Sequence, residues 1–155
     1  FQIFRLPVED GGVRSLARGH VFYEEYPSDP PSHVLNGMIF ALFGIYDLLR
    51  IIEKCKNREV EELFQTGIQS VWKLSGAYDL GFWTKYDLYD ETSYNSKINP
   101  STLHYHYLHI DQFRVLQKIT KDKRFGEVAE RWKAYITPWN ILKAYIQKLR
   151  MLQWL

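Results

Sequence analysis

The stretch from residue 32 to about residue 54 most constrains the fold, because it reads as a helix with apolar side chains on nearly every face. A helix that is apolar all round must be covered on most of its sides. Ser32 follows two prolines, and we expect it to cap this helix. One stripe at helical spacing contains Gly37, Ala41, Gly44 and Leu48. Since each glycine costs a helix about 1 kcal/mol relative to alanine, this stripe predicts the close approach of another helix.

Four further segments show helical periodicity or a helix-start signal. They cover residues 58–78, 99–120, 122–136 and 138–152, with Pro100 at one predicted helix start, Asp122 at the next and Pro138 at the last. Residues 1–26 read as an extended lead-in, and residues 81–98 alternate aromatic and polar residues, as a β-hairpin or an ordered aromatic loop does. We therefore predict a mostly α fold. It would be an incomplete (α/α) toroid or barrel fragment of helix hairpins, with a short β lead-in and one β-hairpin.

Length and charge narrow the class of protein. The chain has 155 residues, which suits a single domain spanning residues 1–155. The formal net charge of +2 gives no sign of the basic stripe that nucleic-acid binding needs. No apolar run is long enough to predict a membrane span. The aromatic share of 16% suits both a core and a carbohydrate cleft, where flat rings stack on sugars.

Two features of the sequence concern the cellular compartment and the rest of the protein. Cys55 is the single cysteine, so no intrachain disulfide can form and the cysteine content does not indicate a compartment. The sequence opens at Phe1 with neither an initiator methionine nor a signal peptide. We therefore expect a fragment of a longer protein, whose N-terminal part would be a partner of this one.

Four short segments stand out along the chain. They are Val8-Glu9-Asp10-Gly11-Gly12, then Tyr23-Glu24-Glu25-Tyr26-Pro27 with Val34-Leu35-Asn36-Gly37, then Lys85-Tyr86-Asp87-Leu88, and Tyr105-His106-Tyr107-Leu108-His109-Ile110-Asp111-Gln112. In order and spacing they resemble the C-terminal domain of D-glucuronyl C5-epimerases, the enzymes of heparan sulfate and heparosan maturation. The resemblance runs from about Val8 to Tyr135 and does not include residues 137–155.

The resemblance implies a set of catalytic groups. On the matching positions these are Tyr26, Tyr86, Tyr105 and Glu25. The chain departs from the family pattern at three places. Tyr89 stands where an arginine directly follows Tyr-Asp-Leu, Tyr107 and Leu108 replace two threonines, and Asp111 stands where an asparagine is usual.

Other polar and aromatic residues of these segments are expected to contact the substrate. They are Asn36, His109, Gln112, Trp83 and Arg114. His106 and His109 lie three residues apart and could share a helix face, as metal ligands do. No second cluster of ligands completes such a site, so we expect no metal. Tyr105 and His109 fall on one helix face, where the imidazole could orient the phenol.

The residue types suit proton transfer next to a carboxylate. The C5 proton of a glucuronate lies α to a carboxylate, so its removal adds charge to a group that is already anionic. Tyrosine, with an ordinary pKa near ~10, serves as an acid when neutral and as a base once nearby cations lower its pKa. The resemblance thus implies an isomerase that converts D-glucuronate to L-iduronate within a glycosaminoglycan-like polysaccharide. Tyrosines would abstract and return the proton, and no organic cofactor is needed.

Two alternatives remain open from the sequence. A uronate-polysaccharide lyase or an unsaturated glucuronyl hydrolase would use an α/α toroid as well, and a lyase shares the first proton abstraction. A polysaccharide-binding module without catalysis would use the same aromatic residues. In each case the expected ligand is an anionic uronic-acid polysaccharide, nucleic acid is not a partner, and a homodimer could form.

Overall fold

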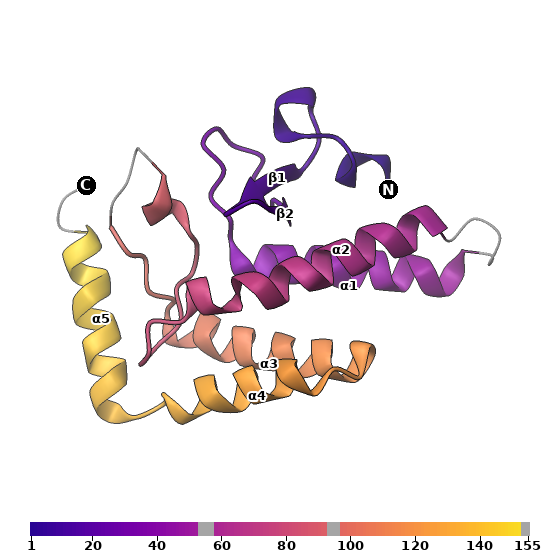
Figure 1. The fold of residues 1–155 in the computed structure, drawn as a ribbon. Helices are drawn as coiled ribbons and strands as arrows, with labels where there is room; N and C mark the ends of the chain where they lie inside the picture. The colour runs from indigo at the N-terminus through magenta and orange to yellow at the C-terminus, as the bar shows by residue number, and fades with distance from the viewer. Residues whose placement is uncertain (53–57, 93–96, 153–155) are drawn as a thin grey trace. The chain divides into compact units, whose positions relative to one another are not determined.

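The structure is a computed structural model that describes residues 1–52, 58–92 and 97–152 (Figure 1). Cys55 lies outside these residues. The chain divides into two compact units, residues 1–74 and residues 75–155. The fold is mostly α with one antiparallel hairpin, which confirms the predicted fold class.

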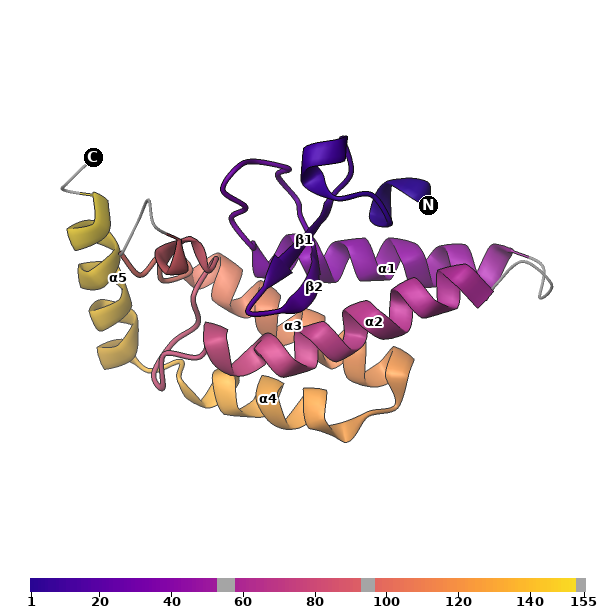
Figure 2. The same ribbon diagram turned by 45° about the horizontal axis from the view of Figure 1, so that its top comes forward.

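The N-terminal unit pairs a β-hairpin with two long helices. Short 3-10 turns at Gln2–Phe4 and Val8–Asp10 precede strands β1 (Arg14–Ala17) and β2 (His20–Tyr23), and helices α1 (Leu35–Ile51) and α2 (Arg58–Leu74) follow. The two loop residues of the hairpin, Arg18 and Gly19, both have positive φ, the backbone twist that closes two-residue hairpins. The hairpin lies against α1 and α2 (Figure 2).

Two predictions for this unit are wrong. Helix α1 begins at Leu35 with Val34 at the N-cap position, so Ser32 does not cap it. His33 has a φ of 55°, in the left-handed region, so the helix cannot extend back through it. The glycine stripe of α1 does not receive another helix, because Gly44 is exposed and its α-carbon faces open space. The close approach occurs instead at Gly67 of α2, where a β-carbon would overlap Leu42 of α1.

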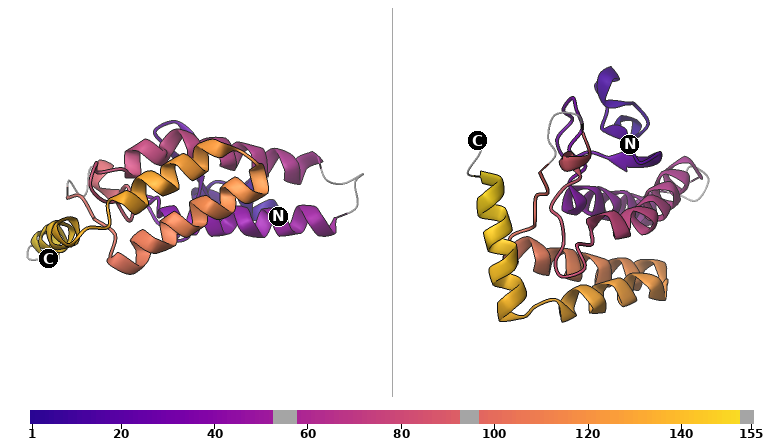
Figure 3. Two further views of the ribbon diagram at one scale, coloured as in Figure 1. Left: turned by 90° about the horizontal axis from the view of Figure 1, so that it is seen from below. Right: turned by 60° about the vertical axis from the view of Figure 1, so that its left-hand side comes forward.

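The C-terminal unit contains three helices and a long loop. A 3-10 turn at Ser75–Tyr78 leads into the loop, which contains a second short turn at Tyr89–Glu91, and helices α3 (Leu103–Thr120), α4 (Lys123–Ala134) and α5 (Pro138–Leu152) follow. Helices α3 and α4 pack side by side (Figure 3) around Phe113, Phe125 and Trp132. Asp79 ties the loop to α4, since its carboxylate accepts hydrogen bonds from Arg131, Trp132 and Tyr135.

Helix starts in this unit differ in how well the sequence predicts them. Asp122 caps α4 through the Arg124 backbone N–H, as predicted. Pro100 lies ahead of α3 rather than in its first turn, because Thr102 caps that helix through the Tyr105 N–H. In the described part of the loop between residues 81 and 98 only isolated bridges occur, which makes it an ordered aromatic loop and not a second hairpin.

Helix α5 follows the predicted bounds, but its apolar stripe is exposed. Ala144 is its buried residue, while Trp139 is 72% exposed. The remaining apolar side chains that face solvent are Leu142, Tyr145, Ile146, Leu149 and Leu152. No helix among the described residues is long and apolar enough to cross a membrane.

Candidate active site

Two of the predicted catalytic tyrosines meet in the C-terminal unit. The rings of Tyr86 and Tyr105 lie 4.7 Å apart between centroids, edge to face at 67°. Both side chains are partly exposed. The backbone N–H of Tyr86 donates to the Asn99 carbonyl at 2.8 Å, and Tyr105 sits in the capped first turn of α3. A loop and a helix start thus hold two phenols together at the surface.

A buried polar network lies at the residues next to this tyrosine pair. The indole of Trp83 stacks on the His106 ring at 3.8 Å between centroids, and neither residue has any exposed surface. The Thr84 hydroxyl lies 2.9 Å from His106 Nδ1, 3.1 Å from His109 Nδ1 and 2.7 Å from the Ser101 hydroxyl. This network joins the residues just before Tyr86 to Ser101 and to the first two turns of α3.

The hydrogen-bond network assigns the proton positions on both histidines. His106 Nε2 lies 3.0 Å from the Trp132 carbonyl, which only accepts, so Nε2 carries the hydrogen and Nδ1 accepts from the Thr84 hydroxyl. Thr84 has one hydrogen, so His109 Nδ1 must donate to the Thr84 oxygen. His109 Nε2 is then an acceptor, and it makes no hydrogen bond with any described residue.

Burial keeps both imidazoles neutral. Loss of solvation lowers the pKa of His106 from 6.5 to about 4, although its hydrogen bond to Trp132 opposes the shift. Burial, together with the neighbouring His106, lowers the pKa of His109 to about 3. Because His109 and Trp83 are both fully buried, neither offers a surface to a sugar. Their contacts are with the buried network, since Trp83 stacks on His106 and His109 bonds Thr84.

Charged groups flank Tyr86 along the loop. The buried ammonium of Lys85 pairs with Asp90 at 2.7 Å and Glu91 at 3.8 Å. Asp87 accepts a hydrogen bond from Asn99 at 2.6 Å and another from the Tyr89 backbone N–H at 3.2 Å. Burial raises the pKa of Asp87, and the hydrogen bonds from Asn99 and Tyr89 oppose that rise.

In the N-terminal unit the two adjacent glutamates have different surroundings. Glu24 is buried. Its Oε1 accepts a hydrogen bond from the Ser15 hydroxyl at 2.5 Å and lies 2.6 Å from His33 Nδ1, and its Oε2 accepts from the His33 backbone N–H at 3.0 Å. Glu25 is exposed, as expected for the next residue along an extended chain. Glu24 is therefore a structural carboxylate, while Glu25 can reach a ligand.

Glu25 rests on the first turn of α1. Its carboxylate accepts from Asn36 Nδ2 at 3.4 Å, and its side chain lies so close to Gly37 that a β-carbon there would overlap it. A carboxylate at a helix N-terminus is favoured by the helix dipole. Tyr26, the next residue, is 55% exposed. The structure thus places three predicted residues, Glu25, Tyr26 and Asn36, at one end of α1.

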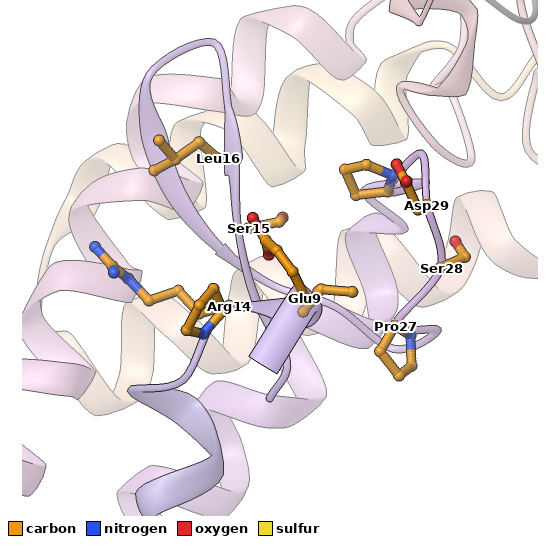
Figure 4. Close-up of a pocket in the computed structure, with 10 residues that line it drawn as sticks. Glu9, Arg14, Ser15, Leu16, Pro27, Ser28 and Asp29 are labelled. Atoms are coloured by element: carbon orange, nitrogen blue, oxygen red, sulfur yellow. The ribbon is translucent and has the colours of Figure 1, made fainter. Parts of the chain in front are cut away.

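A pocket of about 620 Å³ opens on the same unit, a size common for small-molecule sites. Glu9, Ser15 and Leu16 line it on one side, and Pro27, Ser28 and Asp29, which follow Tyr26, line it on the other (Figure 4). None of the predicted site residues lines this pocket. The Glu9 motif and the residues after Tyr26 were visible in the sequence, but their convergence depends on how the chain folds back.

The remaining predicted contacts lie elsewhere on α3. Gln112 is buried, and Arg114 pairs on the surface with Glu130 at 2.8 Å and Asp111 at 3.3 Å. Those carboxylates raise the pKa of Arg114. Among the described residues no group of three histidine, cysteine, aspartate or glutamate side chains could hold a metal ion. Arg114 thus forms its ion pairs with carboxylates of α3 and α4, and in the described part of the chain none of its contacts is with Tyr86 or Tyr105.

The sequence did not point to three residues that shape the tyrosine site. Thr84 organises the buried network, Asn99 bonds Asp87, and Lys148 reaches both Asn99 and the Tyr86 ring from α5. Thr84 and Asn99 flank recognised motifs, yet nothing in their spacing marks them. Lys148 is distant in sequence, and only the course of α5 brings it to the loop.

The fold and the site define a mostly helical protein with a pair of partly exposed tyrosines, each close in sequence to residues of a buried polar network. The chain belongs to the family described as D-glucuronyl C5-epimerase C-terminus, which matches residues 1–134. It is 36% identical over 143 residues to the D-glucuronyl C5-epimerase of Caenorhabditis elegans, covering 86% of this chain and 23% of that protein. It is also 29% identical over 134 residues to an uncharacterized protein of Methanocaldococcus jannaschii, covering 84% of this chain and 40% of that protein. The chain thus spans less than half the length of either relative.

Proposed function

We propose that this chain carries catalytic residues for the epimerisation of D-glucuronate to L-iduronate at C5 within a glycosaminoglycan-like polysaccharide. The Tyr86–Tyr105 pair is the observation that supports this most. Both residues stand on motif positions of the family, both are partly exposed, and their hydroxyl-bearing rings are in contact. Membership of the epimerase family and the name of the nematode relative support the same assignment.

The pair suits the proton transfer that this reaction requires. Removing the C5 proton needs a base within hydrogen-bond reach, and a phenolate is a strong one. A phenolate is stabilised when a nearby hydroxyl donates a hydrogen bond to it, and a second phenol beside it is a donor of the right kind. Inversion further requires a proton donor on the opposite sugar face. The resemblance assigns Tyr26 and Glu25 to the same reaction, and their roles are part of this proposal.

The rigidity of the buried residues close to the two tyrosines in sequence matters for the reaction rate. Catalytic groups act best when their neighbours lock them in place, because a misplacement of about 1 Å can cost 100-fold in rate. His106, Thr84 and Trp83 are buried and mutually bonded, so they provide such a support. Within this proposal His109 and Trp83 hold the site in shape and do not bind the sugar.

Incubating the complete protein with a glucuronate polymer in deuterium oxide tests the proposal. Epimerisation predicts deuterium at C5 together with the appearance of iduronate. A new ultraviolet-absorbing double bond would identify a lyase instead. Binding of the polymer without any C5 exchange would contradict catalysis and identify a binding module.

A further inference from the structure

Helix α5 lies beyond the residues that the family matches, yet it brings a cation to the candidate site. Its residue Lys148 has its ammonium 5.9 Å from the centroid of the Tyr86 ring. The same ammonium donates a hydrogen bond to the side-chain oxygen of Asn99. Figures 1 and 3 show α5 running beside the loop that carries Tyr86 and Asn99. An element outside the family match therefore contributes directly to the surroundings of a catalytic candidate.

The position of Lys148 is set by a short chain of polar contacts. Asn99 donates from its amide nitrogen to Asp87 at 2.6 Å and accepts from Lys148 with its amide oxygen, so both ends of the amide are used. Lys148 is partly buried. Burial lowers the pKa of its ammonium, and the negative charge of Asp87 opposes that shift. The lysine is thus held in one place rather than extended into solvent.

Lys148 makes no direct ion pair with any described carboxylate. It differs in this from Lys85, the lysine in the loop. Lys85 is buried and forms ion pairs with Asp90 and Glu91, which balance its charge. The contacts of Lys148 are an amide oxygen and an aromatic ring, and both leave an ammonium able to bind an anion. An ammonium with these contacts, next to a phenol, is available to a carboxylate ligand.

We propose that Lys148 binds the carboxylate of the uronate whose C5 proton is transferred at Tyr86 and Tyr105. This inference rests on the proposed function. The reaction adds negative charge to a carboxylate, and a cation fixed nearby stabilises that charge. A carboxylate that accepts a hydrogen bond from this ammonium at about 2.8 Å stays near Tyr86, because the ammonium itself lies 5.9 Å from the centroid of the Tyr86 ring. Lys148 would thereby orient the sugar with C5 toward the phenols.

A purely structural role for Lys148 predicts a different behaviour. Helix α5 has other attachments to the same loop region, since Lys143 lies 3.8 Å from the centroid of the Phe82 ring and Ala144 is buried. If Lys148 served only to fasten the helix, its loss would lower stability and affect all ligands alike. If it binds the carboxylate, its loss will matter only for ligands that carry one.

The test compares two oligosaccharides on the complete protein, one with glucuronate and one in which the carboxylate has been reduced to an alcohol. The variants are Lys148→Met, Lys148→Arg and Lys148→Gln, with Lys143→Met as the matched control on the same helix. We expect Lys148→Met and Lys148→Gln to weaken binding of the glucuronate form at least tenfold and, because the carboxylate gains charge during the reaction, to lower kcat as well as raise KM. Binding of the reduced form should change less than twofold, Lys148→Arg should retain most of the affinity, and Lys143→Met should resemble the wild type.

Equal losses for both oligosaccharides, or unchanged binding of the glucuronate form, would overturn the proposal for Lys148. Melting temperatures separate these results from unfolding, and Lys148→Arg gives a folded comparison if Lys148→Met is unstable. Absence of C5 exchange in the wild type would instead refute the proposed function. In that case the carboxylate-specific loss of binding would still be measured, so the two failures are distinguishable.

Discussion

The absence of a β-carbon at Gly37 allows Glu25, a proposed catalytic residue, to lie where it does. The side chain of Glu25 occupies the space that a β-carbon at this helix position would fill. Gly37→Ala must therefore move Glu25 or the start of α1. We expect the rate of C5 exchange to fall by about 10- to 100-fold, measured as deuterium incorporation in the complete protein.

Gly44→Ala is the matched control, because Gly44 lies in the same helix with open space around its α-carbon. Alanine is favoured over glycine in a helix by about 1 kcal/mol, so this variant should be as active as the wild type and equally or more stable. Full activity of Gly37→Ala would show that the close contact between Gly37 and Glu25 has no bearing on catalysis.

At the residue scale, the sequence is a better guide to which residues belong to the candidate site than to how buried those residues are or what they contact. Tyr86 and Tyr105 were selected from separate motifs, and the structure brings their rings into contact. His109 was expected beside a ligand and is instead fully buried on Thr84. Burial depends on which helix face meets α4, and the motif around His109 does not specify that. Lys148 was missed because its contacts span 49 residues to Asn99.

At the element scale, the packing of α3 against α4 makes the fold sensitive to acid. His106 on α3 is neutral when folded, with a pKa of about 4 against an ordinary 6.5. Between these values the unfolded chain binds the proton more readily, so stability is complete above about pH 6.5 and is lost as the pH falls toward 4. At pH 5 the expected loss from His106 is about 2 kcal/mol, and His109 adds a loss of the same sign.

Denaturant unfolding at pH 7.5 and at pH 5 checks this dependence. His106→Gln should be less stable at pH 7.5, and the difference between its two values should be smaller than in the wild type. His104→Gln is the control, because His104 lies exposed on the same helix. If His106→Gln and the wild type lose equal stability on acidification, the proton assignment for this network is wrong.

Helix bounds could be predicted where a side chain supplies the cap. Asp122 marks the start of α4 in the sequence because its carboxylate bonds the N–H groups that a helix start leaves unpaired. The start of α1 could not be predicted in this way, because Val34 caps it without a side-chain bond. The loop before α3 holds isolated bridges in place of a hairpin, and its shape depends on contacts such as Trp83 Nε1 to the Ser101 carbonyl. Such contacts join residues far apart in sequence, so local patterns do not predict them.

At the scale of the whole molecule, the apolar face of α5 predicts measurable surface behaviour. Trp139 is 72% exposed and Leu149 is 55% exposed, and other apolar side chains of the helix lie beside them. Exposed apolar patches of this kind promote association and bind hydrophobic dyes. We expect the 155-residue chain to bind such a dye and to sediment with a concentration-dependent mass. Leu142→Lys combined with Leu149→Lys should reduce both signals, and a monomer without dye binding would contradict this expectation.

The central claim concerns the tyrosine pair, and Tyr105→Phe tests it most directly. This change removes one hydroxyl and keeps the ring that contacts Tyr86. Tyr107→Phe is the matched control, since Tyr107 lies two residues further along α3 with its side chain exposed. In the complete protein with a glucuronate polymer in deuterium oxide, the account predicts that Tyr105→Phe incorporates deuterium at C5 at least about 100-fold more slowly than the wild type, while Tyr107→Phe does not differ. Unchanged exchange in a folded Tyr105→Phe protein would contradict it.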